Sequence, residues 1–280
     1  MKRQLLLGLI CLVAFSTFAG NDPSLMGARG IALGRAFTGV KGSLWALSYN
    51  PAGIAFLDAP AVGVYSERRF GLKELSYGGA AFAMPFKDRH YVGAEVGSFG
   101  YSNYRETKAS LAYATHFLGV LSVGTKVNFS NVNIPDLGSS TTAFVDIGLN
   151  YSLSKTLSIG ASAYNVNQAK IRTVNGKQNI PTVLSAGISY TPSEKILLVA
   201  DIQKDMTRPL SIRGGVEYFF IKNLCARIGM SSQPLSTNIG IGWQFKGINL
   251  DIAGSLHERL GFTPSLSLSY KFVKKTKIAE

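Results

Sequence analysis

The sequence VLSVGTKVNFS at positions 120–130 alternates between two kinds of side chain, and TAFVDIGLNYS at positions 142–152 does the same. In the first stretch most odd positions are apolar, as at Leu121, Val123, Val127 and Phe129, whereas the even positions carry Ser, Gly, Lys and Asn. Because successive side chains of a β-strand leave opposite faces, a period of two predicts strands with one apolar and one small or polar face.

This alternation recurs from Pro60 almost to the end of the chain, in runs separated by turn residues. Runs of about ten alternating residues are typical of transmembrane barrel strands. An even number of strands brings both ends of the chain to the same side of the sheet. The pattern predicts fourteen strands, at 60–69, 73–84, 89–98, 105–116, 119–131, 141–153, 156–167, 181–191, 195–204, 210–220, 223–231, 237–245, 247–256 and 264–273.

The breaks between the strands favour a barrel in the outer membrane. Even-numbered strands lead into tight turns such as Lys87-Asp88, Ser154-Lys155 and Lys246-Gly247, whereas odd-numbered strands lead into longer loops such as Asn167–Ile180 and His257–Thr263. Short turns on the periplasmic side and longer loops outside are the pattern of bacterial outer-membrane barrels.

Aromatic residues close the even-numbered strands and predict a girdle at the periplasmic interface: Phe86, Tyr113, Tyr151, Tyr190, Tyr218, Phe220, Trp243, Phe245, Tyr270 and Phe272. A secreted β-sandwich or soluble barrel also alternates, but it turns its apolar face inward and carries charge outside. Here the polar face is mostly Gly, Ser and Asn, which suits a lumen. We therefore expect an all-β fold, a transmembrane antiparallel β-barrel of about fourteen strands with an N-terminal plug segment in the lumen.

The first nineteen residues have the features of a signal peptide. Lys2 and Arg3 precede an apolar stretch, Leu5–Phe15, that is too short to span a bilayer, and Thr17 and Ala19 stand at the positions that signal peptidase requires. No other window offers the roughly eighteen consecutive apolar residues of a membrane helix. We expect an integral protein of the outer membrane of a Gram-negative bacterium, with residues 1–19 cleaved.

Residues 20–58 do not alternate. Gly27, Gly30 and Gly34 recur among apolar residues, and Asn50 and Pro51 predict the cap and first position of a short helix over Ala52–Phe56. Because fourteen strands enclose more space than their own side chains fill, we expect this segment to plug the lumen. The predicted division is a signal peptide at 1–19, a plug at 20–58, a barrel at 59–273 and a periplasmic tail at 274–280.

The segments Gly27-Ala28-Arg29, Leu33-Gly34, Ala36-Phe37 and Ser48–Ala55, which follow a signal peptide and precede a barrel, resemble the PorV/PorQ family. That family lies within the wider group of FadL-type long-chain fatty acid transporters. Lys41-Gly42-Ser43 replaces acidic residues that these proteins often carry. The resemblance implies a plug or hatch motif made of Arg29, Gly34, Asn50, Pro51, Ala52 and Gly53.

Two activities follow from this resemblance: protein secretion, which we favour, and the transport of hydrophobic molecules, which is the alternative. A protein of the PorV/PorQ kind is expected to be a component of, or accessory to, protein secretion of the type IX kind at the outer membrane; a FadL-type protein passes hydrophobic small molecules across that membrane. In either case polar residues of the lumen are expected to hold the plug through charge-assisted hydrogen bonds, with simple wetting of the lumen as the alternative: Lys126, Asp146, Arg213, Glu217, Arg227 and Asp251.

The net charge, the predicted export and the last strand indicate which binding partners to expect. A net charge of +13 suits nucleic acid, but export argues against that partner and favours lipid and lipopolysaccharide of the outer membrane. The alternation that ends at Phe272 resembles the signal read by the barrel-assembly machinery. Secretion-system proteins and hydrophobic ligands are the further partners that the resemblance implies.

A hydrolase at the outer rim is a third possibility. A catalytic site would need a nucleophile or activated water beside a base. His90 and His116 fall near periplasmic strand ends, and His257 has no serine partner that the sequence singles out. We expect no catalytic residues, no metal and no cofactor.

Overall fold

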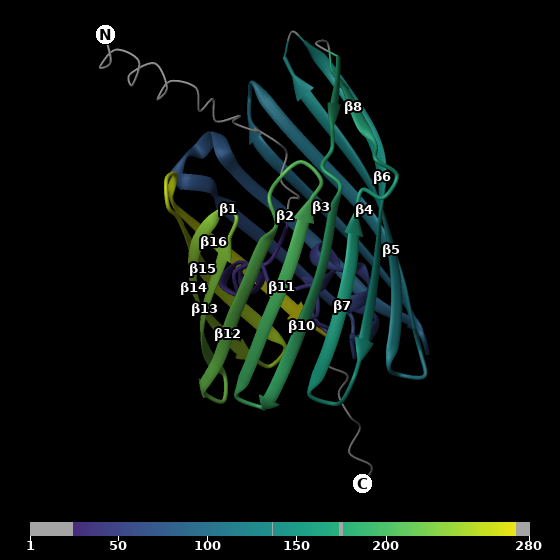
Figure 1. Ribbon diagram of the computed structural model, residues 1–280, viewed down its shortest axis with the longest axis vertical. Coiled ribbons are helices and arrows are strands. Elements are labelled where there is room, and N and C mark those ends of the chain that lie inside the picture. Colours follow the sequence, from purple (N-terminus) through teal and green to yellow (C-terminus); the bar gives the residue numbers. More distant parts are fainter. Residues whose placement is uncertain (1–24, 136, 174–175, 273–280) are drawn as a thin grey trace, which may run out of the picture.

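The computed structural model describes residues 25–272 with the exception of 136, 174 and 175. Within these residues fourteen strands pair in a closed antiparallel barrel, in the order β1-β16-β15-β14-β13-β12-β11-β10-β7-β6-β5-β4-β3-β2 (Figure 1). The predicted all-β fold, an antiparallel barrel of fourteen strands, is confirmed. The signal peptide predicted at 1–19 and the tail predicted at 274–280 lie outside the described residues.

The strands of the barrel match the predicted ones to within a few residues. They are β1 (Ala61–Arg68), β2 (Ser76–Lys87), β3 (His90–Tyr101), β4 (Tyr104–Phe117), β5 (Leu121–Ile134), β6 (Gly138–Ser152), β7 (Leu157–Tyr164), β10 (Val183–Ser193), β11 (Ile196–Asp205), β12 (Ser211–Ile221), β13 (Leu224–Ser232), β14 (Leu235–Phe245), β15 (Ile248–His257) and β16 (Gly261–Lys271).

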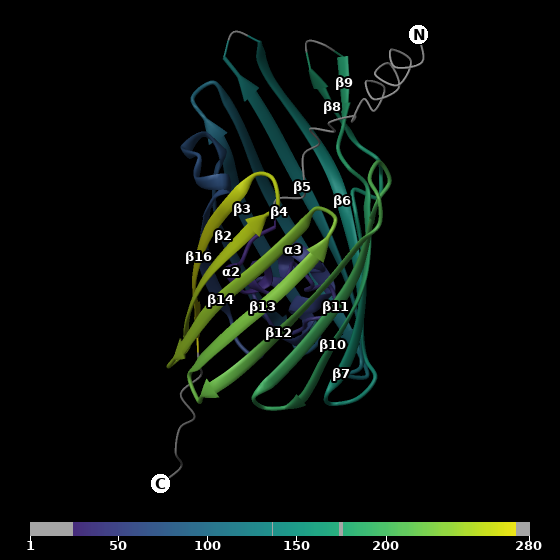
Figure 2. The ribbon, with the colours of Figure 1, turned by 60° about the vertical axis from the view of Figure 1, so that its left-hand side comes forward.

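The two ends of the barrel differ. The turns at 88–89, 153–156 and 246–247 and the end of β16 form what we call the lower end. At the opposite, upper end the long strands β4, β5 and β6 rise above the rest of the wall, together with the hairpin of β8 (Lys170–Thr173) and β9 (Gly176–Asn179) (Figures 1 and 2).

Side chains of the wall divide by parity as the alternation predicts. On β6, Leu149 is 50% exposed on the outside, whereas Asn150 is 1% exposed and faces the interior. A water-soluble sandwich would have the reverse arrangement, because it buries its apolar face. The aromatic residues of the predicted girdle, from Phe86 to Phe272, are all exposed at the lower ends of their strands. No helix among the described residues is both long and apolar enough to cross a bilayer.

One predicted loop was wrong, and another contains a hairpin that was not predicted. The predicted loop His257–Thr263 is a three-residue turn, 258–260, because the Nδ1 atom of His257 accepts hydrogen bonds from the backbone N–H groups of Arg259 at 3.1 Å and Leu260 at 3.3 Å. The predicted loop Asn167–Ile180 contains the hairpin β8–β9, which lies along the upper part of β6. The upper end therefore differs from the lower end by its tall strands and this hairpin more than by loop length.

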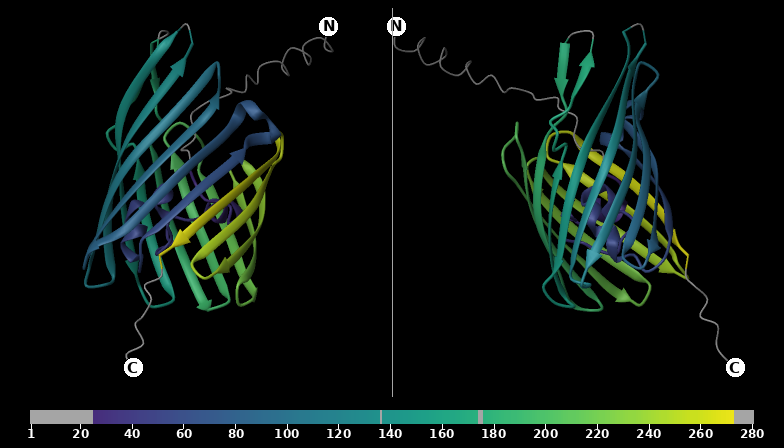
Figure 3. Two further views of the ribbon diagram at one scale, coloured as in Figure 1. Left: turned by 180° about the vertical axis from the view of Figure 1, so that it is seen from behind. Right: turned by 90° about the vertical axis from the view of Figure 1, so that its right-hand side faces the viewer.

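Residues 25–59 lie inside the ring of strands (Figures 2 and 3). We call residues 25–59 the inner segment. It contains the helices α2 (Ala28–Ala32) and α3 (Ala46–Tyr49) and the 3₁₀ helix η2 (Pro51–Phe56), the last of which was predicted. Its buried apolar residues form the main core of the protein together with alanines, tyrosines and other apolar residues of the wall, so this core is in the lumen. Its function as a plug stays a prediction.

Candidate functional site

Asn50 connects the inner segment to the wall. Its Oδ1 atom accepts a hydrogen bond from the Ala52 N–H at 3.1 Å, which is the predicted helix cap. Its Nδ2 atom donates to the carbonyl oxygens of Thr38 at 2.8 Å and of Leu149 on β6 at 2.9 Å. One fully buried side chain thus caps η2, closes the loop that precedes it and binds the barrel.

Gly34 and Gly53 allow close packing around this motif. Gly34 has φ +69°, and a Cβ atom there would lie 2.5 Å from the carbonyl oxygen of Met230 on β13. A Cβ atom at Gly53 would lie 2.7 Å from that of Ala46. Pro51 occupies the first position of η2, and the carbonyl of Ala52 accepts from the Ser122 hydroxyl at 3.0 Å. These motif residues fit the inner segment against the wall.

Arg29 and three wall residues form the first of two buried ion clusters, which we call the α2 cluster: Arg29, Glu217, Arg227 and Asp251. Nε and Nη2 of Arg29 lie 2.8 and 2.7 Å from the two carboxylate oxygens of Glu217. Arg227 lies between Glu217, at 2.5 Å, and Asp251, at 2.7 Å. Two guanidinium groups face two carboxylates, so the buried charges balance.

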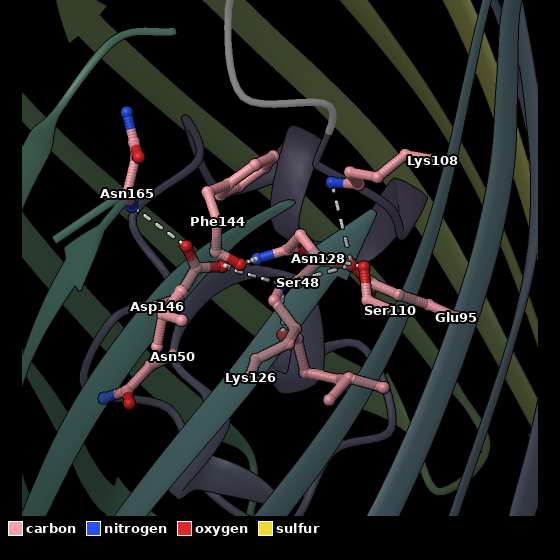
Figure 4. Close-up of polar contacts among 12 residues, drawn as sticks. Ser48, Asn50, Glu95, Lys108, Ser110, Lys126, Asn128, Phe144, Asp146 and Asn165 are labelled. Atoms are coloured by element: carbon pink, nitrogen blue, oxygen red, sulfur yellow. Dashed lines mark hydrogen bonds and ion pairs between the residues drawn. The ribbon is translucent and has the colours of Figure 1, made fainter. Parts of the chain in front are cut away.

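The second ion cluster, which we call the α3 cluster, contains Glu95, Lys108, Lys126 and Asp146 (Figure 4). Lys126 Nζ lies 3.1 Å from Glu95 and 3.4 Å from Asp146, and Lys108 Nζ lies 3.7 Å from Glu95. Lys126 also donates to the carbonyl of Leu47 at 3.1 Å, while Glu95 accepts from the Ser48 hydroxyl at 2.7 Å. The wall therefore contacts α3 through one cationic side chain, Lys126, and one anionic side chain, Glu95.

Five of the six predicted lumen residues thus fall into two clusters, each beside a helix of the inner segment. Arg213 lies on β12, where its Nε donates to Ser211 at 3.4 Å. These contacts support the predicted role of holding the inner segment, which stays a prediction.

Sequence reasoning missed Glu95, Lys108 and Asp201. Asp201, on β11, accepts hydrogen bonds at Oδ2 from the backbone N–H groups of Phe37 and Thr38, both at 2.9 Å. The available signal was parity: Glu95 stands at mid-strand on the small, polar face of its predicted strand, and Asp201 stands on the face of its strand opposite Ala200 and Ile202. An isolated charged residue on that face has to meet a partner inside the barrel.

An apolar cluster lies on the inner side of the upper parts of β5 and β6. Its buried residues Val132, Phe144, Ile171 and Ile180 pack with Tyr104, Ile134, Tyr164 and Ala169, and we call this set the mouth cluster. Inward positions of β5 change from Asn128 and Ser130 lower down to Val132 near the top. The hairpin β8–β9 covers the cluster with Ile171, which is 2% exposed. The lumen therefore offers an apolar surface above the two ion clusters.

The upper hairpin and the α3 cluster are connected. Oδ1 of Asp146 accepts from the backbone N–H of Asn165 at 3.0 Å, just where β7 ends and the chain turns toward β8 (Figure 4). Its Oδ2 accepts from Asn128 Nδ2 at 2.9 Å. Asp146 thus contacts both the base of the hairpin and the lysine that holds α3.

The histidines occupy structural positions. His257 closes the turn after β15, as described above, and Nδ1 of His90 lies 2.6 Å from the Tyr113 hydroxyl. His116 lies between the rings of Phe56 and Tyr91. Within residues 25–272 as described, no three His, Cys, Asp or Glu side chains form a group suited to a metal ion. The absence of catalysis and of a cofactor stays a prediction.

Comparisons with known proteins find solved structures of similar fold. No protein-family model matches the chain, and no curated protein sequence matches it either. Solved structures of similar fold include a CymD monoaromatic hydrocarbon channel, with a TM-score of 0.68 at 13% identity over 90% of this chain and 99% of that one. The P. putida toluene transporter TodX has a TM-score of 0.67 at 13% identity, over 91% and 100% of the two chains.

A Pseudomonas aeruginosa FadL homologue has a TM-score of 0.66 at 11% identity, over 89% of this chain and 98% of that one. The chain therefore has the fold of FadL-type barrels. These proteins are described as channels and transporters, and the similarity extends to the fold alone. The finer resemblance to PorV/PorQ finds no counterpart among these three structures.

Proposed function

We propose that this barrel lies in the outer membrane of a Gram-negative bacterium, with its upper end outside, and conducts small hydrophobic molecules inward. The outward apolar faces and the aromatic rings at the lower end support the membrane location. The inner segment fills the lumen and serves as the plug. Passage then requires that this segment shift while the barrel stays closed.

The mouth cluster carries this proposal. A channel for polar solutes gains nothing from apolar side chains in its lumen, because water wets them poorly. Here Phe144 is 1% exposed and packs edge to face on Tyr164, with ring centroids 5.0 Å apart. A hydrophobic molecule that entered under the hairpin would exchange water for these side chains.

Secretion was the first activity expected from the sequence. The structures with a similar fold are described as a hydrocarbon channel, a toluene transporter and a FadL homologue, which favours transport over secretion. The mouth cluster also suits a small apolar solute better than a folded protein, because the hairpin covers it.

The transport proposal is tested by changing the hairpin. Ile171→Ser removes the apolar cover of the mouth cluster, while Arg172→Ser changes the next residue, whose side chain is exposed. Uptake of radiolabelled toluene and of oleate is measured in cells that carry each variant as their sole copy. We expect Ile171→Ser to change uptake of at least one compound several-fold and Arg172→Ser to leave both unchanged.

Deletion separates the two activities. If the barrel transports hydrophobic molecules, cells without it take up toluene or oleate more slowly and still deliver secreted proteins to their surface. If it serves secretion, delivery fails and uptake stays normal. A deletion strain that is normal in both assays would contradict both functions.

A further inference from the structure

A cavity of about 450 Å³ lies at the lower end of the barrel, between the inner segment and strands β13 to β16. Arg29, Ser43 and Trp45 line it from the inner segment, and Asn223, Gln244 and Asn249 line it from the wall. This cavity is far from the mouth cluster, and its lining is mainly polar. It has no part in the transport proposed above.

The charges around the cavity are unequal. Among the described residues that line it, Arg29, Lys246 and Lys271 are cationic and only Asp251 is acidic, but Arg29 is paired with Glu217, so the two lysines are the cations in excess. That carboxylate is already engaged by Arg227 at 2.7 Å. Lys271 contacts Asp58 at 3.0 Å, but both side chains are largely exposed, at 40% and 72%, so solvent weakens this pair.

Two further donors near the cavity lack acceptors. Trp45 is 3% exposed, and its indole N–H has no hydrogen-bond partner among the described residues. Nη2 of Arg227, which borders the cavity through Asp251, also has none in that part of the chain. The ammonium of Lys246 lies over the ring of Phe245, 5.1 Å from its centroid. The indole and guanidinium donors are buried, so the Lys246 ammonium, whose side chain is exposed, is the one of these three groups that a ligand in the cavity can reach.

The cavity also reaches the aromatic rim. Phe245, Ile248 and Tyr270 belong both to its lining and to the outward apolar surface at the lower end. In a membrane this is the level at which lipid headgroups meet the wall. We infer that the cavity binds the anionic headgroup, carboxylate or phosphate, of an amphipathic molecule whose chain lies along these outward side chains. Charge-assisted hydrogen bonds from Lys246 and Lys271 would hold the headgroup.

The chain supplies its own probe, because Trp45 and Trp243 are its two tryptophans and only Trp45 lines the cavity. Trp243 lies on the outside, stacked on Phe245, so Trp243→Phe removes its signal and keeps an aromatic ring. The variant is solubilised in dodecyl maltoside, a neutral detergent, and titrated with dodecyl phosphate while Trp45 emission is recorded. Inorganic phosphate in a second titration separates a bound amphiphile from a free anion.

We expect a saturable change in Trp45 emission with dodecyl phosphate, at concentrations where inorganic phosphate has no effect. In the same background, Lys246→Gln with Lys271→Gln should weaken this binding at least tenfold. Lys155→Gln with Lys195→Gln removes the same charge from other lower turns and should leave the affinity unchanged. Heat-modifiable migration on gels verifies that every variant is a folded barrel.

Three results would overturn the inference. Trp45 emission that does not respond to dodecyl phosphate excludes the site. Equal affinity of the two double variants shows that general charge at the lower end, and not the cavity, binds the ligand. Equal affinity for inorganic phosphate assigns the cavity to a free anion and removes the amphipathic ligand.

Discussion

Arg29 of α2 and Glu217 of β12 form a two-point ion pair across 188 positions of sequence, with Nε to Oε2 at 2.8 Å and Nη2 to Oε1 at 2.7 Å. Burial lowers the pKa of Arg29, but the carboxylates of Glu217 and Asp251 raise it by more, so it lies above its ordinary value. Arg29 therefore stays charged in the lumen. The pair fixes the helix at one orientation on the wall.

Glu217→Ala should strongly destabilise the protein, because it leaves Arg29 and Arg227 without their shared carboxylate. Removing one partner of a buried ion pair costs about 3 to 5 kcal/mol. Urea unfolding in detergent micelles, followed by tryptophan fluorescence, measures this loss. Glu194→Ala, at an exposed lower turn, is the matched control and should change the free energy of unfolding little. Equal losses in the two variants would show that the α2 cluster does not anchor the inner segment.

The strands could be predicted because their signal is local. From Leu121 to Ser130 and from Ala143 to Ser152, the apolar or polar character of each side chain indicates its face of the strand. Alternation therefore identifies the strand without knowledge of the neighbouring strands. The cap at Asn50 could also be predicted, because the capping residue and the helix that it caps are adjacent in the sequence. Its second role was not predictable, since the carbonyl of Leu149 that it binds lies 99 positions away.

The ion clusters and the short helices depend on the closed barrel. Lys126 meets Glu95 across β4, a contact set by the register of three strands and not by any spacing in the sequence. The helix α2, ARGIA, has five residues and no side-chain cap, so it is too short to be stable alone. Confinement by the wall stabilises it, and no local pattern predicts that.

Leu149→Arg tests whether the outer face meets lipid. On this face an arginine costs about 2 to 4 kcal/mol at the middle of a bilayer and about 0 to 1 kcal/mol near an interface. Leu149 lies above the girdle residue Tyr151, so Leu149→Arg should cost more than an arginine below that girdle. Leu153→Arg, in the turn after β6, is therefore the control. Unfolding titrations in lipid vesicles compare the two. Similar costs at both positions would argue against a bilayer around the barrel.

Gly148 shows that the lumen has no spare room next to Leu149. Even a Cβ atom there would overlap Oδ1 of Asn50 and lie 3.0 Å from Cδ of Pro51. Gly148→Ala should cost about 1 to 3 kcal/mol through overpacking. At Gly78 a Cβ atom would lie 3.9 Å from the carbonyl oxygen of Tyr65, so Gly78→Ala should be tolerated. Thermal unfolding of both variants checks this difference.

Asp146→Asn should loosen the upper hairpin and α3 together. The variant keeps the shape of the side chain but removes the charge that Lys126 faces at 3.4 Å, and it weakens the acceptor that holds the Asn165 N–H at 3.0 Å. Because Lys126 also binds the carbonyl of Leu47, a change at Asp146 reaches both elements. Hydrogen exchange resolved by peptide should show lower protection at residues 165–171 and 46–49, by about tenfold for each 1.4 kcal/mol lost.

Glu217→Gln is the matched control for this coupling, since it removes one buried carboxylate charge from the α2 cluster. It should lower protection at residues 28–32 and leave the hairpin unchanged, because the contacts of Glu217 lie with Arg29 and Arg227. Faster exchange at the hairpin in Asp146→Asn without any change at 46–49 would mean that the α3 cluster holds the inner segment independently of the hairpin. In that case a molecule that binds at the mouth cluster could not release α3 by moving the hairpin.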